Sequence, residues 1–137
     1  MGSHPATATT IGALSGLSIL VVDDHMESLE RVVEILQGAG AIAVGVRTAN
    51  AAIGFATVAR FDAVVVDLTT EDGAWFLQQL GETPTPSRET PVFAISGDRH
   101  DLRHRERFAG YFLKPVNRDA LIAGLAALPR RSQLDAR

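Results

Sequence analysis

Five polar residues that can do chemistry each follow an apolar stretch of the sequence: Asp23, Asp24, Asp67, Ser96 and Lys114. Together they supply three carboxylates, one hydroxyl and one ammonium group. Two adjacent carboxylates repel each other and are costly to bury unless a cation meets them. The acidic pair Asp23 and Asp24 therefore predicts that a metal ion, or a lysine from elsewhere in the chain, approaches it.

The apolar stretches before these residues are typical of strands buried on both faces of a sheet, because they do not alternate with polar residues. They occupy residues 19–22, 61–66, 91–95 and 111–113, and a less apolar stretch at 41–46 predicts a strand nearer an edge. Helical spacing between the strands, as at Leu29, Val32 and Leu36, predicts a doubly wound parallel α/β sheet. Functional groups of such sheets gather at the carboxyl ends of the strands, so we expect the five residues to share one rim.

This set of side chains predicts phosphoryl chemistry. Clustered carboxylates are the oxygen ligands that Mg²⁺ takes in proteins. Lys114 offers a point charge to a phosphoryl group, and the Ser96 hydroxyl can donate a hydrogen bond to the same group. Asp67 is the predicted nucleophile, because aspartate forms aspartyl-phosphate in some enzymes and because this residue ends the most apolar strand.

Length and composition set the frame for this site. The chain has 137 residues, a net charge of −3 and no cysteine, which favours one domain, no nucleic-acid partner and a reducing, cytoplasmic setting. No apolar run is long enough to span a membrane. Residues 1–16 resemble an expression scar followed by a flexible segment. The domain itself is expected to span residues 17–129. Residues 130–137 are interpreted as a polar tail or a cut linker.

The order and spacing of these motifs resemble the receiver domain of response regulators in two-component signalling. The matching pieces are residues 19–24, 61–68, Asp72 with Gly73, 94–97 and 110–115, and they extend over residues 17 to about 129. The resemblance implies a chemotaxis-regulator-like, flavodoxin-like (βα)5 fold with strand order 2-1-3-4-5. It further implies a signalling module that modifies only itself and is not a turnover enzyme.

The resemblance also implies a role for each site residue. Asp67 would accept a phosphoryl group from a histidine kinase or a histidine phosphotransfer protein. Asp24, Asp67 and the backbone carbonyl of Thr69 would hold Mg²⁺, with Asp23 acting mostly through water. Ser96 and Lys114 would contact the phosphoryl oxygens, and Tyr111 would turn inward when Ser96 moves. Lys114 and Pro115 would be joined by a cis peptide bond, and Gly97 would leave room for the donor imidazole.

Two segments depart from the family pattern. Only four residues separate Asp67 from Asp72, without the usual proline. The stretch 98–107 is very polar, so the fourth helix is expected to be short or irregular, and the usual dimer through that helix and the fifth strand is not carried over. We expect a non-standard output surface and an output partner that the sequence does not identify. His25 is expected to be a solvated loop residue beside the site.

Other functions compete with phosphoacceptance. A receiver-like interaction domain that is not phosphorylated is one alternative, which the short segment after Asp67 keeps open. A phosphohydrolase of the haloacid dehalogenase type is another, although such enzymes need two aspartates separated by one residue and a cap insertion. The chain is expected to be either a stand-alone receiver or part of a longer protein such as a hybrid histidine kinase.

Overall fold

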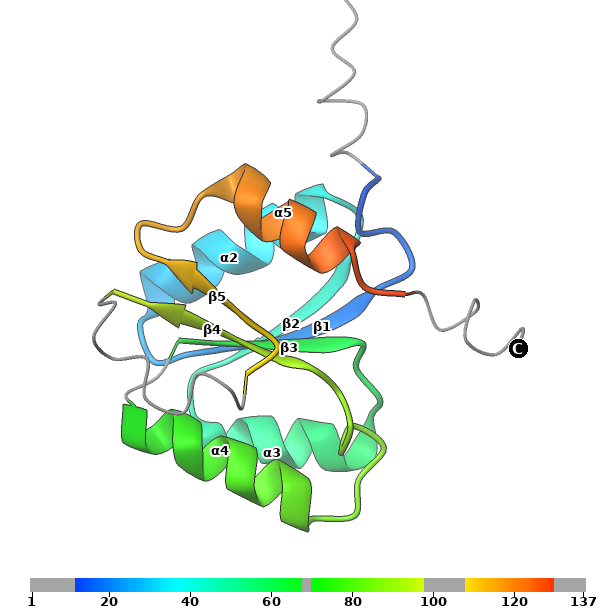
Figure 1. The fold of residues 1–137 in the computed structure, drawn as a ribbon, viewed down its shortest axis with the longest axis vertical. Helices are drawn as coiled ribbons and strands as arrows, with labels where there is room; N and C mark the ends of the chain where they lie inside the picture. The colour runs from blue at the N-terminus through cyan, green and yellow to red at the C-terminus, as the bar shows by residue number, and fades with distance from the viewer. Residues whose placement is uncertain (1–11, 68–69, 98–107, 130–137) are drawn as a thin grey trace, which may run out of the picture.

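The computed structural model describes residues 12–67, 70–97 and 108–129, which form a five-stranded parallel sheet with helices on both faces (Figure 1). The strands pair in the order β2-β1-β3-β4-β5, which confirms the predicted topology. Their bounds are β1 Ser18–Asp23, β2 Ile42–Val46, β3 Ala63–Asp67, β4 Val92–Ser96 and β5 Gly110–Leu113. The less apolar strand β2 is at an edge, as its composition indicated.

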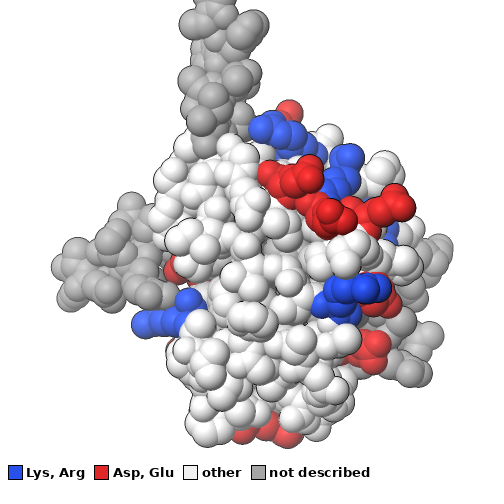
Figure 2. Space-filling view, turned by 180° about the vertical axis from the view of Figure 1, so that it is seen from behind, with Lys and Arg blue, Asp and Glu red and all other residues white. Residues whose placement is uncertain are grey.

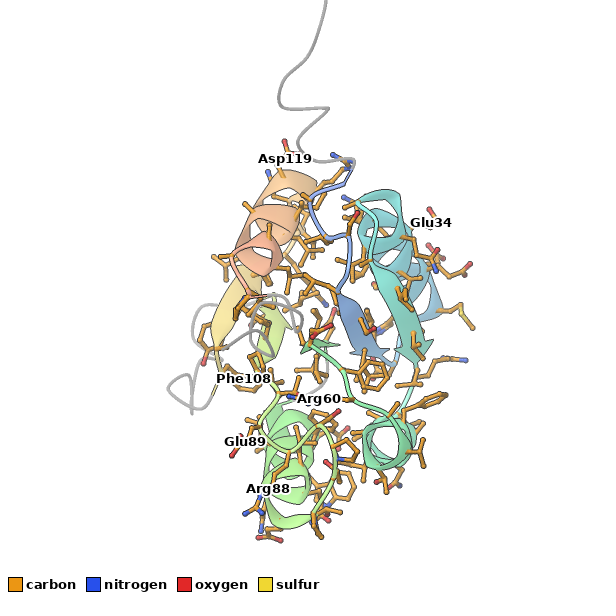
Figure 3. All side chains as sticks on the ribbon, turned by 90° about the vertical axis from the view of Figure 1, so that its right-hand side faces the viewer. Glu34, Arg60, Arg88, Glu89, Phe108 and Asp119 are labelled. Atoms are coloured by element: carbon orange, nitrogen blue, oxygen red, sulfur yellow. The ribbon has the colours of Figure 1, made fainter. Side chains whose placement is uncertain are left out.

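Four helices cover the sheet in the described parts of the chain: α2 Met26–Gly38, α3 Ala49–Val58, α4 Thr70–Glu82 and α5 Arg118–Ala126. Helices α2 and α5 lie on one face, whereas α3 and α4 lie on the other (Figures 1 and 3). Local signals start two of them, because the side chains of Thr48 and Asn117 accept hydrogen bonds from the first turns of α3 and α5. The predicted α2 face is confirmed, with Leu29, Val32 and Leu36 buried.

Strand β1 forms the centre of both hydrophobic cores. Ile19 and Val21 point into the core under α2 and α5, and Leu20 and Val22 point into the core under α3 and α4. Successive side chains of a strand face opposite sides of the sheet, so a continuous apolar run is what a strand with two buried faces requires. Fixing β1 in this way also fixes the position of Asp23 at its carboxyl end.

The fold begins earlier than residue 17, which corrects the expected domain boundary. Leu14 is fully buried in the core under α2 and α5, and its amide donates a 2.9 Å hydrogen bond to the Ala39 carbonyl. Residues 12–16 therefore pack onto the domain, because burying one leucine outweighs the small, polar composition of its neighbours. Residues 1–11 and 130–137 lie outside the described structure.

An Asp-Gly pair predicts a turn at Asp72 and Gly73. The spacing of Phe76, Leu77 and Leu80 predicts only a short third helix after it. Both predictions are wrong. Helix α4 begins at Thr70, so both residues lie within it. Acidic residues favour the first turn of a helix through its dipole, and the sequence places Asp72 there. The predicted short or irregular fourth helix falls on residues 98–107, outside the described residues.

Few charged residues lie in the elements at the β2 edge of the sheet. Neither β2 nor α3 contains a charged residue, whereas the exposed side of α2 carries Glu27, Glu30, Arg31 and Glu34. Seen from behind, the charged side chains lie mostly toward the margins of a broad uncharged area (Figure 2). A search of the described helices finds none with the length and apolar character needed to cross a membrane.

Candidate functional site

The register of the central strands places two of the predicted carboxylates side by side. Parallel pairing of β1 with β3 aligns the Cα atoms of Asp23 and Asp67, the last residue of each strand. Ser96 ends β4, the next strand along, and Lys114 directly follows β5. The predicted rim of polar residues is therefore present at the carboxyl ends of the strands.

An ion pair joins two of these residues across the sheet. The ammonium Nζ of Lys114 lies 2.8 Å from Oδ2 of Asp67. The amide of Lys114 donates a 2.8 Å hydrogen bond to the carbonyl of Ser96, which holds the lysine backbone at the end of β4. The peptide bond between Lys114 and Pro115 is cis, as expected from the resemblance. The Asp67 side chain is mostly buried, whereas that of Lys114 is partly exposed.

Asp23 is the most deeply buried charged group described. Its side chain is 1% exposed, and its Oδ1 accepts a 2.9 Å hydrogen bond from the His25 amide. Its Oδ2 has no hydrogen-bond partner among the described residues. The pKa of Asp23 is raised from its ordinary 3.8 to about 6, chiefly by burial and also by the negative charge of Asp67, despite the lowering effect of the hydrogen bond from the His25 amide.

Asp24 contacts a different side chain, the imidazole of His25. Its Oδ1 lies 2.8 Å from the imidazole Nδ1 of His25, and both side chains are exposed. The same nitrogen lies 3.8 Å from Oδ1 of Asp23. His25 is solvated, as expected, but the sequence analysis missed its contact with the acidic pair. The signal available was its position, one residue after two carboxylates.

The residues present fit a divalent cation. The possible ligand atoms of Asp23, Asp24 and His25 all lie within 4.8 Å of one another. Lys114 pairs with Asp67, whereas the buried Oδ2 of Asp23 has no hydrogen-bond partner in the described structure. A buried carboxylate in this state is costly, and a bound cation would remove that cost.

The other residues predicted to belong to the site are Ser96, Tyr111, Gly97 and Thr69. Ser96 is half-buried at the end of β4. Tyr111 lies in β5 with its ring centroid 5.6 Å from that of Phe108, edge to face. Gly97 follows Ser96, and a Cβ atom there would lie 3.7 Å from the Lys114 side chain. Thr69, whose carbonyl was the fourth predicted metal ligand, lies outside the described residues.

Comparison with known proteins decides the family. The model of the response regulator receiver domain matches residues 19–126. The chain belongs to this family. It is a receiver domain of the kind found in signalling proteins, with the strand order 2-1-3-4-5 that its sequence predicted.

Solved structures include several similar receiver domains. A CheY-like receiver from Methylobacillus flagellatus is 27% identical, with a TM-score of 0.75 over 85% of this chain and 99% of that chain. The receiver of a signal transduction histidine kinase from Syntrophus aciditrophicus is 28% identical, with a TM-score of 0.66 over 80% and 86%. The receiver of a Pseudomonas aeruginosa sensor histidine kinase, solved with magnesium in its active site cleft, is 22% identical, with a TM-score of 0.71 over 81% and 95%. No curated protein sequence matches the chain.

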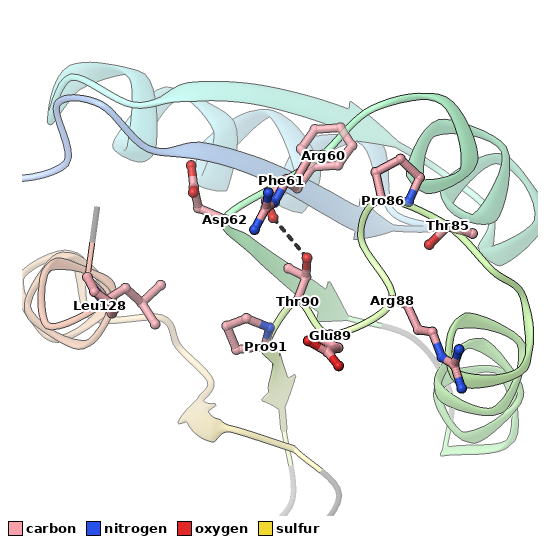
Figure 4. Close-up of a pocket in the computed structure, with 11 residues that line it drawn as sticks. Arg60, Phe61, Asp62, Thr85, Pro86, Arg88, Glu89, Thr90, Pro91 and Leu128 are labelled. Carbon is pink, nitrogen blue, oxygen red and sulfur yellow. Dashed lines mark hydrogen bonds between the residues drawn. The ribbon is translucent and has the colours of Figure 1, made fainter. Parts of the chain in front are cut away.

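The receiver domain also has a cavity of about 430 Å³ at the other end of the strands from the acidic site (Figure 4). Its lining includes Phe61 and Asp62, just before β3, and Pro91, just before β4. The Thr90 hydroxyl donates a 2.8 Å hydrogen bond to the Phe61 carbonyl beside it. Figure 3 looks at this edge and labels Arg60, Arg88 and Glu89 there. Because the cavity lies at the amino ends of the strands, it is separate from the acidic site.

Proposed function

We propose that this receiver domain accepts a phosphoryl group on Asp67 from a phosphohistidine donor and changes conformation to signal. The ion pair between Lys114 and Asp67, at 2.8 Å, is the observation that carries the proposal. A lysine held at this distance neutralises the nucleophile at rest and is in place to meet the charge of an incoming phosphoryl group. Positioning and charge neutralisation are most of what phosphoryl transfer requires from a protein.

The step balances within the site and the donor. An oxygen of the Asp67 carboxylate forms a bond to phosphorus as the bond between phosphorus and the donor imidazole nitrogen breaks. The leaving imidazole keeps the electron pair of that bond and departs as a neutral ring, because its other nitrogen carries a proton. Lys114 moves its contact from the carboxylate to a phosphoryl oxygen, and the Ser96 hydroxyl donates to another.

Asp23, Asp24 and Asp67 would hold Mg²⁺, together with the carbonyl of Thr69. When bound, Mg²⁺ supplies positive charge that offsets the charge of the phosphoryl oxygens. The orphaned oxygen of buried Asp23 supports this assignment, since an oxygen-rich, anionic pocket suits a hard cation. We assign Asp24 and Asp67 to direct contacts and Asp23 to contacts through water, as in the sequence-based expectation.

The expected donor is a histidine kinase or a histidine phosphotransfer protein, and the setting is cytoplasmic. The similarity to a histidine kinase receiver at 28% identity supports a place in a hybrid kinase as well as a stand-alone role. After phosphorylation, movement of Ser96 toward the phosphoryl group would let Tyr111 turn inward. The surface beyond Tyr111 would then carry the signal to an output partner.

Incubation with acetyl phosphate and Mg²⁺ tests the proposal directly. Intact-mass measurement should show one added phosphoryl group on the wild-type chain and none on Asp67→Asn. Asp119→Asn is the matched control, because Asp119 is an exposed aspartate on α5, paired only with its neighbour Arg118 in the described structure. It should be labelled as the wild type is.

Two outcomes would contradict phosphoacceptance. Absence of an adduct with both acetyl phosphate and a phosphorylated histidine donor would favour an unphosphorylated interaction domain. The start of α4 only three residues after Asp67 is the observation that supports that alternative. Continuous release of phosphate from many small phosphoesters would instead favour a phosphohydrolase.

A further inference from the structure

We propose that His25 is an additional ligand of the cation site, and that its imidazole shifts the site toward first-row transition metals such as Mn²⁺ and Co²⁺ relative to Mg²⁺. This inference rests on the proposed function, because it concerns the same cation. It goes beyond it by assigning a nitrogen ligand and a metal preference to this chain. A nitrogen ligand makes the preference for transition metals stronger than carboxylate oxygens alone would.

The distances around His25 suit a shared cation. Its Nδ1 lies 2.8 Å from Oδ1 of Asp24 and 3.8 Å from Oδ1 of Asp23. Two ligands at right angles, each about 2.1 Å from a metal, are separated by roughly 3 Å. The nitrogen and the Asp24 oxygen are therefore already spaced as neighbouring ligands, and all three residues offer atoms within 4.8 Å of one another.

A buried orphan oxygen provides independent evidence for a cation at this place. Asp23 is 1% exposed, and its Oδ2 has no hydrogen-bond partner in the described part of the chain. Buried polar atoms are satisfied in nearly all native proteins, so an orphan in a carboxylate marks a missing ion or water. The amide of His25 holds the other oxygen of Asp23 at 2.9 Å, which ties the imidazole and the buried carboxylate to one short segment.

The fold does not need the imidazole where it lies. His25 is the residue before α2, but its side chain makes no capping hydrogen bond, and 75% of it is exposed. An ion pair between two exposed groups contributes little to stability. Its approach to Asp24 is therefore better explained by a ligand role than by a structural one.

The chemistry of the donor set gives the direction of the preference. Imidazole nitrogen binds transition metals well, whereas Mg²⁺ prefers oxygen ligands and keeps its waters. Adding one imidazole to two carboxylates should strengthen the binding of Co²⁺ more than that of Mn²⁺, with little effect on the binding of Mg²⁺. Loss of the imidazole should reverse that change.

Calorimetric titration of the metal-stripped full chain with MgCl₂, MnCl₂ or CoCl₂ tests the inference. His25→Ala should weaken Co²⁺ binding about tenfold or more, a loss that even outer-shell partners of metal sites produce. Mg²⁺ affinity should change by no more than about twofold, since Mg²⁺ gains little from nitrogen ligands. His25→Gln, which keeps a hydrogen-bond donor beside Asp24, should behave as His25→Ala does. Met26→Ala is the matched control, because Met26 is the exposed next residue.

A spectroscopic readout separates ligation from positioning. Pulsed electron paramagnetic resonance of the Mn²⁺-loaded wild type should show a directly bound nitrogen, and His25→Ala and His25→Gln should lack it. Persistence of that nitrogen signal in His25→Ala would overturn the inference, as would unchanged Co²⁺ affinity. Tighter binding of Mg²⁺ and Co²⁺ alike in His25→Ala would also overturn it, by showing that His25 competes with the cation for Asp24. Failure of the wild type to bind any of the three cations would instead contradict the cation site of the proposed function.

Discussion

Lys114 Nζ contacts Asp67 Oδ2 at 2.8 Å although the two residues follow strands that are not neighbours in the sheet. Strand β4 lies between β3 and β5, so the lysine side chain reaches over the end of β4 to the carboxylate. Its backbone amide is bonded to Ser96 at the end of that intervening strand. Lys114 thus links the residues at the ends of β3, β4 and β5. Loss of its charge would leave the Asp67 carboxylate without its ion-pair partner.

Replacement of Lys114 by alanine should slow phosphorylation of Asp67 without unfolding the domain. Removing one group that stabilises developing charge typically costs about a hundredfold in rate. The rate of mass gain with acetyl phosphate and Mg²⁺ measures this effect. Arg118→Ala, which removes an exposed cation paired only with its neighbour Asp119 in the described structure, is the control and should leave the rate unchanged.

Replacement of Asp23 by asparagine should stabilise the metal-free protein at neutral pH. The pKa of Asp23 is raised from 3.8 to about 6 by burial, so its ionised form is disfavoured in the folded state. Between these two values the folded protein binds more protons than the unfolded chain, and the free energy of unfolding falls as pH rises. At pH 7.5 the neutral side chain should gain on the order of 1–3 kcal/mol.

Thermal unfolding in the presence of a chelator measures this gain across pH. The stabilisation by Asp23→Asn should be present above pH 6 and vanish near pH 3 or below, where Asp23 is protonated in both the folded and the unfolded state. Addition of Mg²⁺ should raise the Tm of the wild type more than that of the variant, because ligands that bind only the folded state stabilise it. An equal gain in Tm by Asp23→Asn above pH 6 and in acid would contradict the conclusion that burial of the ionised carboxylate destabilises the wild type.

Replacement of Ser87 by alanine should destabilise the fold and leave the acidic site intact. Ser87 is fully buried; its hydroxyl donates to the Ala59 carbonyl at 2.9 Å and accepts from the Phe61 amide at 3.0 Å. Loss of this hydroxyl leaves buried backbone groups unpaired, at a cost of about 1–3 kcal/mol. Urea unfolding should show that loss, while the extent of acetyl phosphate labelling stays at the wild-type level. Reduced labelling of the folded variant would show that the region around Ser87, at the amino ends of the strands, is coupled to the acidic site at their carboxyl ends.

Replacement of Leu14 by alanine tests where the domain begins. A fully buried leucine that becomes alanine costs about 2–5 kcal/mol, because a cavity remains. Val58→Ala, at a position that is 78% exposed, should change the free energy of unfolding by less than about 0.5 kcal/mol. Equal stabilities of the two variants in urea would restore the boundary at residue 17.

The sequence by itself determined the sheet and the identity of its rim. Apolar runs such as Val64, Val65 and Val66, alternating with amphipathic helices, predict strands with two covered faces in a parallel sheet. The resemblance to receiver domains supplied the order of those strands. Parallel strands in that topology all end at the same edge, so the placement of Asp23, Asp67, Ser96 and Lys114 at strand ends followed from pattern alone. The family match then agreed with that pattern.

Only the tertiary structure decided which of these residues contact one another. Whether Lys114 pairs with Asp67 or with the acidic pair depends on the register of β1 with β3 and on the reach of a side chain over β4, which no local pattern encodes. The burial of Leu14, the helical state of Asp72 and Gly73, and the approach of His25 to Asp24 were missed for the same reason. Each depends on packing between segments distant in sequence or on a loop conformation, whereas hydrophobic periodicity reports only the face that a single element buries.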